Sequence, residues 1–259
     1  MAKTTALKDI MWLSEAGVDE AIESKPINRF RKKEEPKVAT PSDTTLTTIS
    51  TSAPIAPAAA IAEARKLADA ATTLGALKQA VMDFNGCGLK KTATNTVFAD
   101  GNPESPLMAI GEAPGAEEDK QGIPFCGLSG KLLDQMFLSI GRSRESFYIT
   151  NTLFWRPPGN RQPTPEELAI CEPFVQKHVA LVNPKLLVLV GGTAAKSVLN
   201  SNVGITRLRG KEFSYTNPYL EGRSIPVMVT FHPSFLLRQP MQKKQAWQDF
   251  LAIKKRLNA

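Results

Sequence analysis

The stretch KLLVLVG at residues 185–191 decides the fold class of this chain. An unbroken run of Leu and Val that ends in a glycine is typical of a strand buried on both faces of a sheet. Three further apolar runs have the same character: PLMAI at 106–110, FYITN at 147–151 and IPVMVTF at 225–231. We therefore expect four strands, one for each run.

Helix patterns lie between and after these runs. SGKLLDQMFLSI at 129–140 has its large apolar residues on one side, and shorter patterns at 193–200 and 242–257 follow later strands. Thr164-Pro165-Glu166-Glu167 combines an N-cap, a proline in the first turn and a glutamate at capping-box spacing, which predicts a helix to about residue 182. The alternation predicts an α/β fold of three layers, α/β/α, around a central, mostly parallel four-stranded sheet.

The first 60 residues differ in composition from the rest. Their second half is made mainly of Thr, Ser, Ala and Pro, which bury too little apolar surface to offset the entropy of ordering. We therefore expect an N-terminal helical or flexible segment (1–33), a disordered linker (34–60) and a globular domain (61–259). An amphipathic helix is expected at residues 6–23, and the Ala- and Leu-rich stretch 61–82 predicts the first helix of the domain.

Charge and cysteine content limit the function classes. Residues 1–60 carry eight basic and eight acidic side chains, so the net charge of +7 falls on the remainder. A basic domain favours a polyanionic partner such as nucleic acid, and an ordinary basic soluble domain is the alternative. The chain has no run of 18 apolar residues and no basic leader before an apolar one, so we expect neither a membrane span nor a secretory signal. Three cysteines are too few for a disulfide scaffold, which favours the cytoplasm.

Three loops follow the expected strands, and a parallel sheet places ligands at that edge. The first loop, GEAPGAEEDKQGIPFCG from Gly111, is rich in glycine and lacks the GK[ST] element of a phosphate-binding loop. Its four acidic residues would repel a phosphate, and three of them are expected on a solvated face or at a helix N-terminus. Phe125 in this loop is either a core residue or a stacking platform.

The second and third loops contain the remaining candidate residues. Asn151 ends a strand, where its amide either reads a base edge or caps its own turn. Arg156 and Arg161 lie in a stiff basic loop suited to a phosphate backbone. His232 closes a buried strand, where a histidine is often structural, and His178 is expected on the surface of a helix. The apolar residues after His232 either pack inward or insert between bases.

These loops, in this order, resemble motifs of the uracil-DNA glycosylase superfamily, and most closely those of its type 4 branch. The similar segments are GEAPGAEEDKQGIPFCG, YITN, RPPGNRQPTPEE, LRGK and HPSFLLR, and the similarity covers about residues 84–256. The WRPPGNR segment is similar to a subset of alphaproteobacterial relatives. The resemblance implies an enzyme that flips deoxyuridine out of DNA and hydrolyses its N-glycosidic bond, which starts base-excision repair.

The resemblance also implies a role for individual residues. Gly111, Glu112 and Ala113 would line the uracil pocket and the water site, and Phe125 would stack on the extruded base. Asn151 would pair with uracil N3 and O4 and so reject cytosine. His232 would face O2 and stabilise negative charge on the departing base. Contacts to DNA would come from Arg156, Arg161, Arg238 and a wedge, for which Leu236 is the first candidate and Phe235 the alternative.

Two positions depart from the family pattern. In the best-known branch an Asp orients the attacking water where this chain has Ala113, so Glu112 is the expected substitute, with backbone groups as the alternative. Type 4 enzymes usually hold a [4Fe–4S] cluster on four cysteines. By register, Phe84 and Trp155 stand at two of those positions and only Cys87 and Cys171 are left, so we expect no cluster and no metal. The region RLRGKEF lacks the His through which a related branch bonds covalently to DNA.

The expected function is therefore a uracil-DNA glycosylase that acts as a cytoplasmic monomer on single- or double-stranded DNA. The alternative is a non-catalytic DNA-binding module of the same fold, associated with a DNA polymerase or another replication partner. Residues 1–33 could recruit a replication or repair protein under either reading.

Overall fold

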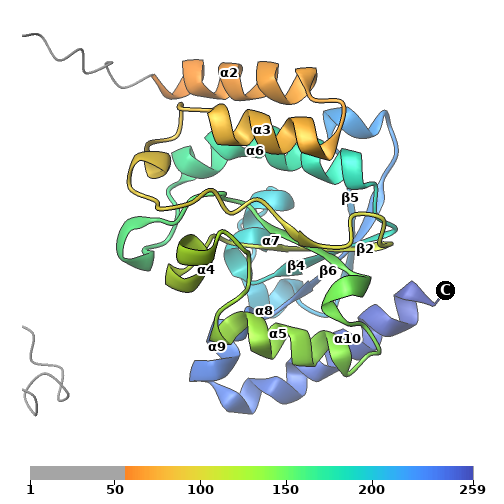
Figure 1. Ribbon diagram of the computed structural model, residues 1–259. Helices are drawn as coiled ribbons and strands as arrows, with labels where there is room; N and C mark the ends of the chain where they lie inside the picture. Colours follow the sequence, from red (N-terminus) through yellow and green to blue (C-terminus); the bar gives the residue numbers. More distant parts are fainter. Residues whose placement is uncertain (1–55, 259) are drawn as a thin grey trace, which may run out of the picture. The chain divides into compact units, whose positions relative to one another are not determined.

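A six-stranded sheet forms the centre of the protein in a computed structural model that describes residues 56–258 (Figure 1). The strand order is β1-β3-β2-β4-β6-β5. The bounds are β1 (Asp100–Gly101), β2 (Leu107–Gly111), β3 (Tyr148–Asn151), β4 (Leu186–Val190), β5 (Glu212–Tyr215) and β6 (Ile225–Thr230). The four central strands are parallel to one another, and β1 and β5 pair antiparallel at the two edges.

The expectation of four strands was wrong, because it missed the two edge strands β1 and β5. The four apolar runs of the sequence form the four parallel strands. β1 is only two residues long, and β5 buries one residue of its four, Tyr215. Edge strands of this kind have too few apolar residues to give a strand pattern, because one side of them faces solvent.

Helices cover both faces of the sheet, which confirms the α/β class. On one face lies α6 (Pro165–Val182), with α2 (Pro57–Ala70) and α3 (Leu74–Asp83) packed against it. The opposite face carries α5 (Leu128–Leu138) and α10 (Lys243–Leu257), as Figure 1 shows. The remaining helices are short: α4 (Ala116–Gln121), α7 (Gly192–Val198), α8 (Ile205–Leu208) and α9 (Pro233–Arg238), with 3₁₀ turns at Gly88–Lys91, Arg144–Ser146, Pro158–Asn160, Pro218–Leu220 and Pro240–Gln242.

The start of the domain differs from the expected boundary. α2 begins at Pro57, so the last four residues of the expected linker are helical, and the stretch expected as one helix from residue 61 is divided between α2 and α3. Ala60, Ala64 and Ala68 of α2 are fully buried. Their small side chains allow α2 to pack closely on α6. The expected segment 1–33, its helix 6–23 and most of the linker lie outside the described residues.

Alternating side chains of each central strand divide the core in two. In β4, Leu187 and Leu189 pack on the α6 side, whereas Leu186, Val188 and Val190 pack on the side of α5 and α10. Burial of each such side chain contributes about 1.5–3 kcal/mol relative to leaving it exposed. None of the helices in residues 56–258 is both long and apolar enough to cross a membrane.

The register of the parallel strands brings their last residues together. Gly111 of β2 pairs with Asn151 of β3, and Val190 of β4 pairs with Thr230 of β6. The segments after these strands therefore leave the sheet at one edge, and the candidate residues are on these segments.

Candidate functional site

A cavity of about 820 Å³ opens at the carboxyl edge of the parallel strands. Glu112, Ala113, Phe125, Asn151 and His232 all line it, although they come from three separate segments of the chain. The structure therefore brings together the residues that the sequence placed on three different loops.

Gly111 lies where two of these side chains meet. A Cβ at this position would lie 2.4 Å from Cζ of Phe125 and 2.5 Å from Oδ1 of Asn151. Both distances are far below van der Waals contact. Only glycine therefore allows the phenyl ring and the amide to approach the end of β2 together.

Asn151 is a buried amide at the end of β3, and its Oδ1 has no hydrogen-bond partner within the described structure. This carbonyl oxygen accepts nothing from its own turn, which does not support the reading of Asn151 as a turn cap. An unsatisfied buried acceptor costs about 1–3 kcal/mol. A ligand with an N–H group at this point would remove that cost.

Phe125 is buried, and its backbone has φ of +53°, in the left-handed region. Non-glycine residues rarely adopt this conformation, which costs about 1–3 kcal/mol and is found most often at functional sites. Its ring centroid lies 5.7 Å from that of His232, with 35° between the planes. Both rings thus border the same part of the cavity.

His232 follows β6 and caps the N-terminus of α9. Its Nδ1 accepts a hydrogen bond from the backbone N–H of Ser234 at 3.2 Å and lies 2.8 Å from the Ser234 hydroxyl. Burial, with a smaller contribution from the positive charge of Arg238, lowers the pKa of His232 to about 4. The imidazole is therefore neutral at pH 7, and because Nδ1 accepts, its proton is on Nε2.

A buried ion pair that the sequence reasoning did not single out holds the end of β6. The Arg209 guanidinium bonds both carboxylate oxygens of Asp249, at 2.7 and 3.1 Å, and lies 5.0 Å above the ring of Phe231. Asp249 also accepts from the hydroxyl of Thr230 at 3.0 Å. These contacts fix the two residues that precede His232. The LRGK motif, which contains Arg209, was the sequence signal available for this ion pair. Nothing in the sequence showed that the partner of Arg209 is in the last helix.

Three of the four acidic residues of the first loop, Glu117, Glu118 and Asp119, form the first turn of α4, which is one of the two arrangements expected. Two of them also act as tethers, which the sequence did not indicate. The Glu118 carboxylate accepts from the backbone N–H groups of Gly115 at 3.1 Å and Gly127 at 3.0 Å. Asp119 is buried and accepts from the backbone N–H groups of Thr94 and Asn95. Together they fix the loop that carries Phe125.

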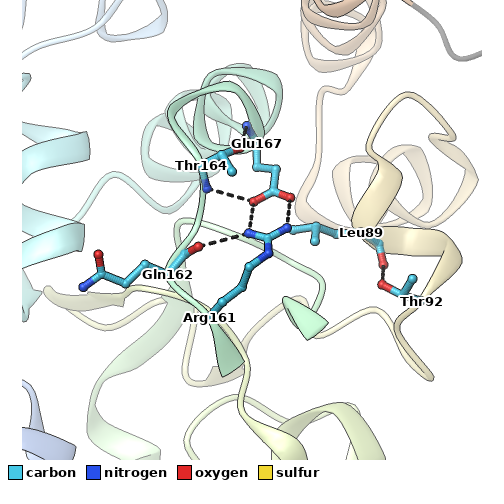
Figure 2. Close-up of polar contacts among 6 residues, drawn as sticks. All are labelled: Leu89, Thr92, Arg161, Gln162, Thr164 and Glu167. Atoms are coloured by element: carbon cyan, nitrogen blue, oxygen red, sulfur yellow. Dashed lines mark hydrogen bonds and ion pairs between the residues drawn. The ribbon is translucent and has the colours of Figure 1, made fainter. Parts of the chain in front are cut away.

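The three candidate arginines differ in position. Arg161 and Arg238 line the mouth of the cavity, whereas Arg156 is not part of the lining and donates from Nε to Asn160 at 2.7 Å. Arg161 is held in a two-point contact by Glu167, at 2.6 and 2.9 Å, and Glu167 also completes the capping box of α6 (Figure 2). The hydrogen bond from Arg161 lowers the pKa of Glu167.

The expectation for Leu236 disagrees with the structure. Residues 233–238 form the short helix α9 instead of a loop, and one side of that helix faces the core. Leu236 is 0% exposed and packs with Phe231 and Ala246, so it does not stand ready as a wedge. Its neighbour Leu237 is 44% exposed, and the alternative candidate Phe235 is half-buried in the cavity wall.

His178 also differs from its expected position. It is fully buried, between the sheet and α6, instead of lying on the surface of the helix. Its Nε2 lies 3.0 Å from the hydroxyl of Tyr148, and its ring stacks on Phe98 at 4.4 Å. Burial lowers its pKa to about 3, so it is a neutral core histidine.

The residues around Cys87 and Cys171 do not fit a four-thiolate cluster. Both thiols are buried, and the neighbouring Cys171 lowers the pKa of Cys87. Beside them lies an aromatic cluster, which we define as Phe84, Phe154, Trp155 and Phe174; its ring centroids are 5.2–6.4 Å apart. Within the described residues, no three His, Cys, Asp or Glu side chains are placed to hold a metal ion.

Comparison with known proteins gives a consistent family. The family model "Uracil DNA glycosylase superfamily" matches residues 98–251. A type-4 uracil-DNA glycosylase of Archaeoglobus fulgidus is 37% identical over 67% of this chain and 87% of its own length. Type-4 enzymes of Sulfurisphaera tokodaii and Thermotoga maritima are 38% and 39% identical, over 70% and 62% of this chain and 84% and 82% of their own lengths. A DNA polymerase of Bacillus phage SP01 is 26% identical over 62% of this chain but only 16% of its own length.

Proposed function

The chain belongs to the uracil-DNA glycosylase superfamily, and from that premise we propose that it is a uracil-DNA glycosylase. It is a hydrolase that cleaves the N-glycosidic bond of deoxyuridine in DNA and releases uracil. The observation that carries this proposal is the single cavity in which Phe125, Asn151 and His232 meet. A base inside a duplex cannot reach such a cavity, so the deoxyuridine must first be flipped out of the stack.

Asn151 is the residue that selects uracil in this proposal. Uracil presents a donor at N3 and an acceptor at O4, which match the free Oδ1 and the amide N–H of Asn151. Cytosine presents an acceptor at N3 and a donor at its amino group, so both contacts would be lost. A site built around a buried hydrogen bond discriminates strongly, because the wrong base leaves its polar groups unpaired.

Phe125 and His232 act on the same base. The phenyl ring stacks on the extruded uracil and fixes its plane. The neutral His232 donates from Nε2 to O2, where negative charge develops as the bond to the sugar breaks. A preorganised hydrogen-bond donor aimed at the atom where charge develops is worth about 3 kcal/mol. Support comes from the Ser234 contacts, which fix the ring and its tautomer.

The attacking water belongs beside Glu112 in this proposal. The backbone carbonyl of Glu112 accepts hydrogen bonds from the N–H of Leu153 at 3.1 Å and from the Thr152 hydroxyl at 2.6 Å. Glu112 also lines the cavity. The carboxylate can orient a water and accept its proton. Ala113, the next residue, also lines the cavity and has only a methyl side chain, which leaves space for that water.

Basic side chains at the mouth supply the contacts to the DNA backbone. Arg161 and Arg238 flank the opening, and Arg156 extends the basic loop next to it. The net charge of +7 favours a polyanionic substrate, and binding should weaken as salt is added.

The decisive experiment measures uracil release from labelled oligonucleotides that contain U:G, U:A or single-stranded uracil. We expect release from all three, and a fall of about 10²–10³-fold in the Asn151→Asp variant, because a carboxylate repels O4. Asn200→Asp, at an exposed turn, is the matched control and should release uracil at the wild-type rate. Full activity of Asn151→Asp would overturn the role of this residue.

The alternative is a non-catalytic DNA-binding module, and the partial match to a phage DNA polymerase is the observation that favours it. The same assay separates the two. A protein that binds uracil-containing duplex but releases no base from any substrate would be such a module.

We propose further that this protein binds no iron–sulfur cluster. Support comes from the donor set, since two thiols cannot supply the four ligands that a [4Fe–4S] cluster needs. Iron and sulfide analysis of anaerobically purified protein should give no more iron than a Cys87→Ser/Cys171→Ser control. Stoichiometric iron that is lost in the control would overturn the proposal.

The remaining expectations are that the protein acts as a cytoplasmic monomer and that residues 1–33 recruit a replication or repair protein. Deletion of residues 1–55 tests the second, and the cut must stop there because α2 begins at Pro57. Uracil release from short oligonucleotides should persist in the deleted protein, while association with the partner is lost.

A further inference from the structure

Two groups contact the backbone carbonyl of Phe125. One is Gly130 of α5, where a Cβ would be only 1.6 Å from the carbonyl oxygen. The other is Arg144, whose Nη2 donates a hydrogen bond of 2.7 Å to this oxygen. Arg144 is 19 residues further along the chain, in the turn that leads into β3.

Arg144 is itself fixed in place. Its Nε lies 3.0 Å from one carboxylate oxygen of Asp134, and Nη2 donates to the other at 3.3 Å. Asp100 lies 3.8 Å away on a second side, and the guanidinium carbon is 5.6 Å from the ring centroid of Phe147. The side chain is mostly buried, so these contacts are only weakly screened by solvent.

The contact acts at the residue whose backbone is in the left-handed region. A phenylalanine with φ of +53° persists only where its surroundings impose that conformation. If the backbone relaxed to a negative φ, the ring would leave its position beside Gly111 and Asn151. The carbonyl of Phe125 is the point at which Arg144 can prevent that relaxation.

We propose that Arg144 is a positioning residue of the uracil site: its guanidinium, oriented by Asp134, holds the strained backbone of Phe125 and so places the stacking ring. This proposal rests on the proposed function. It assigns no contact between Arg144 and the substrate, and Arg144 is not part of the cavity lining.

A double-mutant cycle tests the proposal, with single-turnover uracil release from a U:G duplex at saturating enzyme as the readout. Arg144→Ala should slow release by about 10- to 100-fold, because a displaced ring holds the base out of register. In a Phe125→Ala background there is no ring to place, so the same substitution should slow release by no more than about twofold.

Arg256→Ala is the matched control. Arg256 pairs with Glu212 at 3.2 Å on the exposed part of α10, so its loss removes the same charge from a place remote from the cavity. Release by this variant should stay within about twofold of wild type, and saturating enzyme removes differences in DNA affinity. All rates are measured well below the lowest unfolding midpoint of the set.

Two milder variants keep the test valid if Arg144→Ala does not fold. Arg144→Lys keeps the charge but has all its donors on one nitrogen, so it cannot reproduce the contacts that Nε and Nη2 make with Asp134 and Phe125, and Asp134→Asn weakens the hold on Arg144. Each should slow release by less than Arg144→Ala, and neither should slow the Phe125→Ala protein further.

The results separate this inference from the proposed function. A wild-type protein that releases no uracil defeats the function itself. If wild type is active and Arg144→Ala slows both backgrounds by the same factor, Arg144 has only a structural role and the inference is wrong. The same conclusion follows if Arg144→Ala is as active as Arg256→Ala.

Discussion

The cavity at the sheet edge and the aromatic cluster beside α6 are both made of buried side chains, but they are built in opposite ways. The cavity contains an unpaired amide oxygen and a phenylalanine with a left-handed backbone. In the aromatic cluster three of the ring contacts are edge to face, and Nε1 of Trp155 donates to the Thr96 hydroxyl at 3.0 Å. The cavity residues thus carry local energetic costs of the kind found at functional sites, whereas the residues of the aromatic cluster show neither of these two costs.

The largest effect is expected from Gly111→Ala. The added methyl would collide with both Phe125 and Asn151, so the ring and the amide could not keep their present positions. Uracil release should fall by about 10³-fold, which corresponds to about 4 kcal/mol in transition-state stabilisation. Single-turnover release from a U:G duplex measures it.

Gly75→Ala is the control for this substitution. Its Cβ would meet only the Thr73 hydroxyl, at 3.9 Å, in the first turn of α3. Release should not change, and the protein should become slightly more stable, because alanine is the better helix former by about 1 kcal/mol. If Gly111→Ala released uracil at the wild-type rate, the arrangement of Phe125 and Asn151 in the cavity would not be needed for the reaction.

The next effect concerns the aromatic cluster. Phe84→Ala leaves a hole among Trp155, Phe174 and Cys87, so the free energy of unfolding should fall by about 3 kcal/mol. Urea denaturation measures the loss. The single-turnover rate should stay at the wild-type value wherever the variant is folded. If the single-turnover rate of Phe84→Ala fell as far as that of Gly111→Ala, the aromatic cluster would also be needed for uracil release, and the contrast between the two regions would be wrong.

The smallest effect compares the two histidines, His232 in the cavity and His178 of α6 in the core. The pKa is lowered to about 3 for His178 and to about 4 for His232, so between pH 6.5 and 5 the unfolded chain binds protons that the folded protein does not. Stability must therefore fall as the pH falls, by about 2 kcal/mol per histidine over that interval. His178→Gln should remove about half of this dependence. The free energy of unfolding is measured by urea denaturation at several pH values. If it depended on pH as strongly in His178→Gln as in the wild type, His178 would not be buried as a neutral group.

Much of the fold could be predicted because its signals are local. The helix from Pro165 to Val182 follows from its capping box and proline, and each parallel strand follows from one apolar run. The cavity residues were found through their motifs. Leu236 was placed on the wrong side because a six-residue helix has too short a pattern to show which of two adjacent leucines faces inward.

Other parts of the site depend on contacts between distant residues. Arg144 and Phe125 are 19 positions apart, and Arg209 and Asp249 are 40 apart. In a single sequence these residues have the appearance of ordinary surface charges, because a pairing across the fold leaves no periodic pattern. Such partners become visible only when the chain is folded.

The unpaired oxygen of Asn151 has a consequence for turnover. A freed base carries the same N3–H group as a base still attached to the sugar, so it can satisfy this oxygen equally well. The enzyme is therefore expected to retain its product, and added uracil should compete with DNA for the empty site. Product departure, instead of bond cleavage, would then limit the steady-state rate.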